Sequence, residues 1–270
     1  IKMVSQMVSG CGGTSKARHR FTWEFATIET TPHHQDLVAS TWTFGMASRF
    51  VKKLLRPFTR TKPFEYPSVD PAIVEAWRAV KEDGLTYLSH PKIAALVRLV
   101  QESESAGREG VLIEAGCALG GSSIVLAHTK PTNQTLQVYD VFGMIPAPGD
   151  KDGADVHQRY ETISNGQAHG INDQPYYGYE ADLLAKVQQS FADLGVPHEE
   201  NNVAFYKGLV QDTLQGTEPV VLAHIDVDWY DPVMTCLERI VPRLVVGGSI
   251  VLDDYHDWSG CRRATDEYFD

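Results

Sequence analysis

Short apolar runs alternate with amphipathic segments along the chain beyond Gly110. Runs of about four to eight apolar residues bounded by glycine and polar residues are typical of buried strands, and apolar stripes with a period near 3.6 predict helices. The predicted strands are Val111–Ala115, Leu136–Val141, Val203–Tyr206, Val220–Val227 and Ser249–Leu252. The predicted helices are Ser122–Thr129, Tyr179–Leu194, Pro232–Val241 and Ser259–Phe269. This alternation indicates an α/β fold with a parallel sheet that helices cover on both faces.

Two helices precede this alternation. Asp70 followed by Pro71 is typical of a helix start, with the aspartate as N-cap and the proline at the first helical position. The apolar stripe of the first helix is Ile73, Val74, Trp77 and Val80, and a second helix from Pro91 carries Ile93, Leu96, Val97 and Val100. Between Phe142 and Tyr177 the rhythm stops in a long stretch rich in Gly, Pro, Asp and Asn. A loop of that length after a strand end favours a lid over a ligand site.

Residues 1–65 differ from the rest of the chain in pattern and in charge. They carry 10 basic and 4 acidic side chains, a net charge of +6, whereas residues 66–270 carry 14 and 31, a net charge of −17. We expect residues 1–19 to be mobile, Phe21–Thr27 to form a half-buried strand, and Thr43–Phe58 to form a basic amphipathic helix. That helix is expected to pack on the acidic body or on a second copy of the chain rather than on a membrane. A Pro-rich linker, Arg56–Pro71, joins this basic appendage (residues 1–65) to the main domain (residues 66–270).

Composition narrows the class of protein. Of 270 residues, 43% are hydrophobic and 22% are charged, which is ordinary for a globular chain and excludes a fibre or a disordered tail. The formal net charge of −11 argues against general binding of nucleic acid. Cys11, Cys117, Cys236 and Cys261 lack metal-site spacing and disulfide density, which favours reduced thiols and a cytoplasmic setting. No apolar run approaches the roughly 18 residues of a membrane span.

A glycine-rich turn links the strand at residues 111–115 to the next helix. Residues 111–123 are VLIEAGCALGGSS, in which Gly116 and Gly120 allow the backbone to approach a ligand closely. Such a turn is often only tight packing, and neither the GxGxxG nor the GK[ST] pattern is present. Asp140, at the end of the next strand, favours a nucleoside site, because a carboxylate there can accept hydrogen bonds from both ribose hydroxyls.

Four carboxylates follow two later strands. Alternation along a strand places Asp226 and Asp228 on one face, and Asp253 and Asp254 follow the next strand. Acids that converge at one sheet edge repel each other unless a cation neutralises them, and oxygen ligands suit Mg²⁺, Ca²⁺ or Mn²⁺. The alternative, solvated acids that cap helices, needs fewer acids than are present. His224 is expected to be a core histidine or to support a ligand residue.

These two sites carry a resemblance to a known family. From about Tyr66 onward the chain resembles the class I S-adenosylmethionine-dependent methyltransferases, and most closely the macrocin O-methyltransferase family, which methylates sugar hydroxyls of macrolides and related natural products. The matching stretches, in chain order, are EAGCALGGS at 114–122, YDVFGMIP at 139–146, KGLVQDTL at 207–214, HIDVDWY at 224–230 and DDYHDWSGCR at 253–262. Residues 1–65 take nothing from the resemblance. It implies a Rossmann-like methyltransferase sheet in the main domain.

The resemblance also implies a role for each candidate site residue. The amino acid part of S-adenosylmethionine would be held by Glu114, Gly116, Cys117, Ala118, Gly120 and Ser122. The ribose would bind Asp140, and the adenine would be bordered by Gln211 and Asp212. Asp226 would face the cofactor and, with Asp253 and Asp254, bind Mg²⁺ or Mn²⁺, while Asp228 would act as general base.

The chain departs from the family pattern in two places. Gly143-Met-Ile stands where Glu-Gly-Leu is more usual, so lid contacts are expected to differ. The family sheet ends with an antiparallel hairpin, whereas this sequence ends at Asp270 after the last predicted helix. The strand-like segment Arg20–Ile28 is a candidate to cover that edge, because an uncovered edge invites aggregation.

We therefore expect a Mg²⁺-dependent O-methyltransferase that acts on one hydroxyl of a vicinal diol, on a sugar of a natural product. The alternatives are a catechol-type phenolic O-methyltransferase, a metal-dependent glycosyltransferase, and a non-catalytic binding module of the same fold. The Glu-Ala-Gly turn with Asp140 argues against the glycosyltransferase, and the presence of all four carboxylates argues against loss of catalysis. The expected partners are a small glycosylated diol and, from the aromatic-rich N-terminal region, a second copy of the chain as a homodimer. Neither nucleic acid nor a membrane is expected.

Overall fold

The computed structural model describes residues 2–5, 26–27 and 69–270. The helix predicted at Thr43–Phe58, the first five residues of the strand predicted at Phe21–Thr27, and the boundary between residues 65 and 66 lie outside the described residues. In the described part, no helix is long and apolar enough to cross a membrane. Cys117, Cys236 and Cys261 are buried free thiols.

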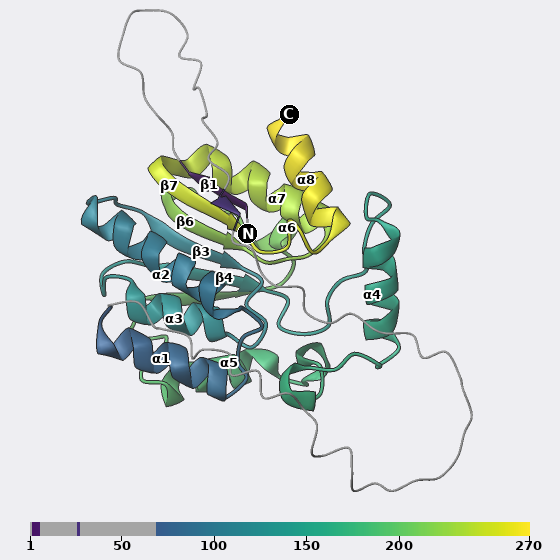
Figure 1. Cartoon of the computed structure of the whole chain (residues 1–270), viewed down its shortest axis with the longest axis horizontal. Coiled ribbons are helices and arrows are strands. Elements are labelled where there is room, and N and C mark those ends of the chain that lie inside the picture. Colours follow the sequence, from purple (N-terminus) through teal and green to yellow (C-terminus); the bar gives the residue numbers. More distant parts are fainter. Residues whose placement is uncertain (1, 6–25, 28–68) are drawn as a thin grey trace, which may run out of the picture.

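One seven-stranded sheet, in the order β2-β1-β7-β6-β3-β4-β5, is the centre of the described part (Figure 1). Its parallel strands are β3 (Val111–Ala115), β4 (Leu136–Asp140), β5 (Val203–Lys207), β6 (Val220–Ile225) and β7 (Leu244–Leu252). All five strands predicted beyond Gly110 are confirmed, although β7 begins earlier than Ser249. Their carboxyl ends lie at one edge of the sheet, so Asp140 at the end of β4, Asp226 after β6 and Asp253 after β7 lie along the same edge.

The N-terminal residues correct two expectations. Lys2–Ser5, predicted to be mobile, forms β1 and pairs antiparallel with β7, with Lys2 opposite Leu252. Arg20–Ile28 was the candidate to cover β7, but its Ala26–Thr27 forms β2, which pairs with β1 and lies one strand further out. The backbone groups along the edge of β7 need hydrogen-bond partners, which β1 supplies. A four-residue strand such as β1 is too short to show a periodic pattern in the sequence.

Helices cover both faces of the sheet, as predicted. On one face lie α1 (Pro71–Glu82), α2 (His90–Ser105), α3 (Gly121–Thr129) and α5 (Leu183–Asp193). On the other lie α6 (Val210–Thr213), α7 (Tyr230–Ile240) and α8 (Ser259–Phe269). Side chains alternate between the two faces of each strand, so the sheet has a hydrophobic cluster on each face. Leu112 of β3 packs with α1, α2, α3 and α5, and Ile113 packs with α6, α7 and α8. The Asp70 N-cap is confirmed, since its carboxylate accepts a hydrogen bond from the Ala72 amide at 2.8 Å.

The segment predicted as a loop from Phe142 to Tyr177 contains a helix. α4 (Ala154–Ser164) stands apart from the two helical layers in Figure 1, and short 3-10 turns follow at Ile171–Asp173 (η1) and Tyr177–Tyr179 (η2). Only Val156 and Ile163 of α4 are buried, so its apolar stripe was too thin to recognise in sequence. The helix predicted from Tyr179 begins instead at Leu183, behind the N-cap Asp182.

Candidate active site

The glycine turn after β3 is held against the end of β6. Gly116 has φ +85°, and a Cβ there would lie 1.8 Å from the carbonyl oxygen of Asp226. Only glycine fits so close an approach with this backbone conformation. The end of β3 therefore packs directly on the backbone that carries Asp226 and Asp228.

Asp140 ends β4 and binds the same turn. Its Oδ2 accepts hydrogen bonds from the amides of Cys117 at 2.8 Å and Ala118 at 3.2 Å, and its Oδ1 accepts one from the amide of Phe142 at 2.7 Å. Burial raises the pKa of this carboxyl, although the three amides favour its charged form. Because each carboxylate oxygen has more than one acceptor position, Asp140 can hold the turn and still accept from a ligand hydroxyl.

Glu114 is fully buried behind the turn. Its carboxylate accepts hydrogen bonds from Ser122 Oγ at 2.5 Å and from Ser123 Oγ, both on α3, and its Oε1 lies 2.9 Å from Nδ1 of His224. These bonds join β3, α3 and β6 beneath the site. The expectation for His224 is confirmed, because its ring is buried in the core and bonded to Glu114.

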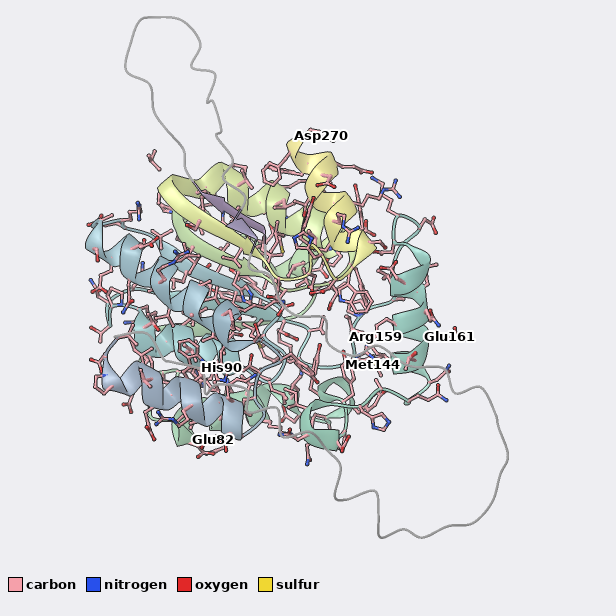
Figure 2. The ribbon with its side chains drawn as sticks, in the orientation of Figure 1. Glu82, His90, Met144, Arg159, Glu161 and Asp270 are labelled. Carbon is pink, nitrogen blue, oxygen red and sulfur yellow. The ribbon has the colours of Figure 1, made fainter. Side chains whose placement is uncertain are left out.

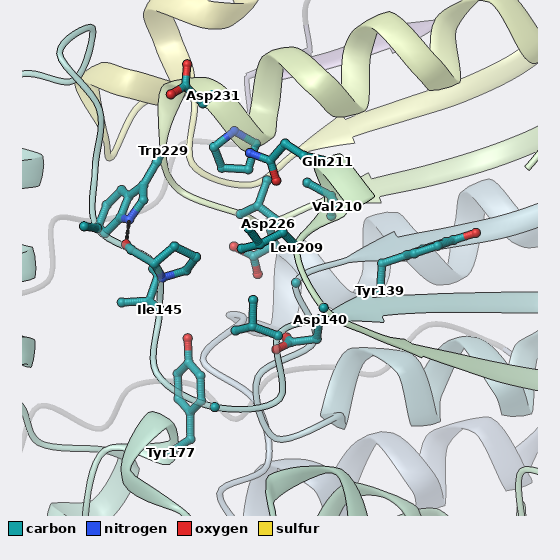
Figure 3. A pocket seen from close by; sticks show the side chains of 18 residues that line it. Tyr139, Asp140, Ile145, Tyr177, Leu209, Val210, Gln211, Asp226, Trp229 and Asp231 are labelled. Carbon is teal, nitrogen blue, oxygen red and sulfur yellow. Dashed lines mark hydrogen bonds between the residues drawn. The ribbon is translucent and has the colours of Figure 1, made fainter. Parts of the chain in front are cut away.

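A pocket of about 220 Å³ lies in front of the turn (Figure 3). The lining includes four residues after β4 (Gly143, Ile145, Pro146 and Ala147) and four between β5 and the start of α6 (Gly208, Leu209, Val210 and Gln211). The indole N–H of Trp229 donates to the Pro146 carbonyl at 3.0 Å. In Figure 3 the hydroxyl of Tyr177 points into this space. The segment Phe142–Tyr177, called the lid below, therefore forms part of the pocket wall.

Four of the residues predicted to bind cofactor line this pocket, namely Gly116, Asp140, Gln211 and Asp226. The other six, Glu114, Cys117, Ala118, Gly120, Ser122 and Asp212, lie outside its lining. Gln211 has a buried side-chain oxygen without a hydrogen-bond partner among the described residues. A buried amide oxygen left without a partner is costly, so this position suits a ligand amino group.

Asp226, Asp253 and Asp254 lie together where β6 and β7 end. Each offers a carboxylate oxygen, and the three oxygens lie within 4.8 Å of one another. Asp226 also lines the pocket, so this acid triad adjoins the pocket. Asp228 follows in a left-handed conformation with φ +56°; its amide donates to Oδ2 of Asp254 at 3.2 Å, and the Trp258 side chain hydrogen-bonds its carboxylate.

The acids of this cluster do not titrate independently. Burial and neighbouring carboxylates raise the pKa of Asp226 and of Asp228 well above the ordinary value, and raise that of Asp254 to about 7. Asp253 differs: burial disfavours its charge, but His224 and Lys92 lower its pKa. Its buried Oδ1 has no hydrogen-bond partner among the described residues. Buried carboxylates that raise one another's pKa can bind a divalent cation, which would neutralise them, and the unpartnered oxygen of Asp253 is available as a ligand.

Three residues near these acids were missed in the sequence. Lys92, in the first turn of α2, forms a 2.7 Å ion pair with Asp253. Arg159 lies on the side of α4 that faces the body of the protein in Figure 2, and its charge opposes the rise that burial causes in the pKa of Asp228. Tyr177 belongs to the lid. The one local signal in the sequence is the lysine directly before the apolar run Ile93–Val97 of α2. The positions of Arg159 and Tyr177 near the acids depend on tertiary structure.

Comparison with known proteins identifies the family. The profile described as Macrocin-O-methyltransferase (TylF) matches residues 77–270. The chain belongs to the macrocin-O-methyltransferase family. It is therefore an S-adenosylmethionine-dependent O-methyltransferase, and the predicted family, fold class and enzyme class are confirmed.

Two relatives of this methyltransferase cover most of the matched region. One is the 8-demethyl-8-(2,3-dimethoxy-alpha-L-rhamnosyl)-tetracenomycin-C 4'-O-methyltransferase of Streptomyces olivaceus, 29% identical over 209 residues that span 75% of this chain and 73% of the relative. The other is the Mycinamicin III 3''-O-methyltransferase of Micromonospora griseorubida, 31% identical over 210 residues that span 74% and 77%.

Solved structures agree on the fold of the methyltransferase. The O-methyltransferase NovP superposes with a TM-score of 0.57 at 23% identity, covering 68% of this chain and 73% of that one. The calicheamicin methyltransferase CalS11 superposes with a TM-score of 0.51 at 14% identity, covering 83% and 90%. At these identities the likeness shows the shared fold alone.

Proposed function

We propose that this enzyme methylates one hydroxyl of a vicinal diol on the sugar of a glycosylated natural product, with Mg²⁺ or Mn²⁺ held by Asp226, Asp253 and Asp254. One observation carries the proposal: a single pocket is lined by Asp140 and Gln211 and reaches the acid triad through Asp226. The names of the two relatives support the acceptor class, since one denotes 4'-O-methylation of a rhamnosyl-tetracenomycin and the other 3''-O-methylation of mycinamicin III.

The lining of the pocket supports a cofactor-binding role for several residues. Asp140 would accept hydrogen bonds from the ribose hydroxyls, and the unpartnered oxygen of Gln211 would accept from the adenine amino group. Gly116 would let the amino acid part approach the backbone, while Glu114 and Ser122 hold the turn from behind. The remaining predicted contacts are those of Cys117, Ala118, Gly120 and Asp212.

The chemistry requires alignment and removal of one proton. When bound, S-adenosylmethionine would supply an activated methyl group for transfer to the acceptor oxygen, with S-adenosylhomocysteine as the second product. A divalent cation at the triad would lower the pKa of the acceptor hydroxyl. Asp228, whose backbone is pinned to Asp254, would take the hydroxyl proton on its carboxylate. Trp258 and Arg159 both favour the charged form of that carboxylate against the effect of burial.

The test is the Asp228→Asn variant, assayed with saturating cofactor and Mg²⁺ on a panel of vicinal-diol glycosides and one catechol. We expect kcat to fall by about 100-fold or more, because the base is lost. Calorimetry should show binding of S-adenosylhomocysteine within about twofold of the wild type, because Asp228 is not among the residues that line the cofactor pocket. Asp193→Asn, at an exposed position of α5, is the control. Unchanged turnover in Asp228→Asn would exclude the base, and turnover of the catechol alone would exclude a sugar acceptor.

A further inference from the structure

Lys92 is a largely buried cation at the edge of the acid triad. Its ammonium lies 2.7 Å from Oδ2 of Asp253, 3.4 Å from the carbonyl oxygen of the same residue and 3.7 Å from Oδ2 of Asp257. Its side chain is only 14% exposed. Lysine is rarely buried unless it is paired. Ile93 and Leu96 of α2 are buried in the core, so the packing of this helix fixes the position of the Lys92 backbone.

The two oxygens of Asp253 have different environments because of this lysine. Oδ2 is taken by Lys92, whereas Oδ1 is buried without a hydrogen-bond partner among the described residues. Nε2 of His224 lies 3.9 Å from Oδ1, too far for a hydrogen bond. Asp253 is thus held by one oxygen and offers the other.

We infer that Lys92 is a resident counter-ion of the metal site, which turns Asp253 into a ligand through one oxygen and weakens the binding of the divalent cation. The inference rests on the proposed metal site. The three negative charges of the triad would be balanced by one divalent cation together with the ammonium of Lys92. Positive charge this close to the site opposes a second cation.

Metal binding and stability of the purified full chain test this role without turnover. Lys92→Met removes both the charge and the hydrogen bond, whereas Lys92→Gln removes the charge and keeps a donor for Asp253. We expect both variants to bind Mn²⁺ about tenfold more tightly than the wild type, measured by calorimetry or by the paramagnetic resonance of free Mn²⁺. The melting temperature without metal should fall, more in Lys92→Met than in Lys92→Gln, because the triad loses its resident cation.

The matched control is Arg98→Met, which removes an exposed cation from the same helix. Its Mn²⁺ affinity should stay within about twofold of the wild type, because exposed charges are screened by solvent. Unchanged or weaker Mn²⁺ binding in both Lys92 variants would overturn the role of Lys92 and leave the metal site standing. If neither the wild type nor any variant bound Mn²⁺, the metal site and the role of Lys92 would both be excluded.

Discussion

Single residues join the two halves of the site. Gly116 lets the glycine turn after β3 contact the backbone of Asp226, and Asp140 accepts hydrogen bonds from two amides of the same turn. The position of the turn relative to the acid triad is therefore set by these contacts before any ligand binds. This kind of preorganisation is what alignment of a methyl donor with an acceptor oxygen requires.

Gly116→Ala should therefore damage stability and cofactor binding together. A Cβ at this position would overlap the Asp226 carbonyl oxygen, so the turn must move away from the triad. We expect a loss of more than about 3 kcal/mol in the free energy of unfolding and no measurable binding of S-adenosylhomocysteine by calorimetry.

Gly107→Ala is the matched control, because Gly107 also has a positive φ, of +63°, but a Cβ there would meet nothing within 4 Å. It should cost about 1 kcal/mol through backbone strain and leave cofactor binding unchanged. Equal losses in the two variants would show that strain, not the contact with Asp226, makes glycine necessary.

At the scale of residues, candidate site residues could be predicted where they directly follow a predicted strand. Asp140, Asp226, Asp253 and Asp254 could be grouped because parallel strands end at one edge, and the structure brings the last three together. Lys92 could not be grouped with them, because 161 positions separate it from Asp253 and only the packing of α2 on the sheet joins them.

At the scale of elements, the beginning of the lid is tied to α7 and α8. The carboxylate of Asp152 accepts a hydrogen bond from the amide of Tyr230, the first residue of α7, at 2.8 Å, and the side chain of the N-cap residue Trp229 makes no capping hydrogen bond there. Asp155 accepts the amide of Ser259, at the start of α8, at 2.9 Å. The lid thus supplies acceptors that these helix starts otherwise lack.

Asp152→Ala should loosen this attachment. The first amide of α7 would lose its acceptor, which should reduce the free energy of unfolding by about 1–2 kcal/mol. Trp229, which precedes Tyr230, lines the pocket together with its hydrogen-bond partner Pro146, so kcat/KM for the acceptor should also fall. Chemical denaturation and initial rates measure the two effects. The exposed neighbour Asp150→Ala is the control, and an Asp152→Ala protein as stable and active as that control would contradict the attachment.

Elements were predictable in proportion to the apolar surface they bury. The strands buried on both faces of the sheet, such as β3 and β6, are apolar except for Glu114 and His224 and are predicted from the sequence. α4 buries two side chains, and β1 joins the sheet through backbone pairing with β7. Neither leaves a pattern that periodicity detects, so the lid helix was missed and residues 2–5 were expected to be mobile.

In the whole molecule, which has a net charge of −11, we expect the acids that follow β6 and β7 to make stability depend on pH. Burial and mutual repulsion raise the pKa values of Asp226, Asp228 and Asp254 in the folded state. The folded protein without metal therefore keeps protons that the unfolded chain releases above about pH 4, so its stability should fall as pH rises toward about 7. His224, whose pKa the interactions with Asp253 and Glu114 raise to about 9 against the effect of burial, stays charged through this range.

Divalent cation should reverse this loss, and more strongly at higher pH. Protons and the cation compete for the same carboxylates, so saturating Mg²⁺ should raise the melting temperature at about pH 8 by at least twice the rise at about pH 5.5. Scanning calorimetry with Mg²⁺ and with a chelator at both pH values measures the difference. The double variant Asp226→Asn with Asp254→Asn removes two of the acids with raised pKa, so both the fall in stability with pH and the response to Mg²⁺ should shrink. An equal Mg²⁺ response at the two pH values would mean that the cation does not bind at these acids.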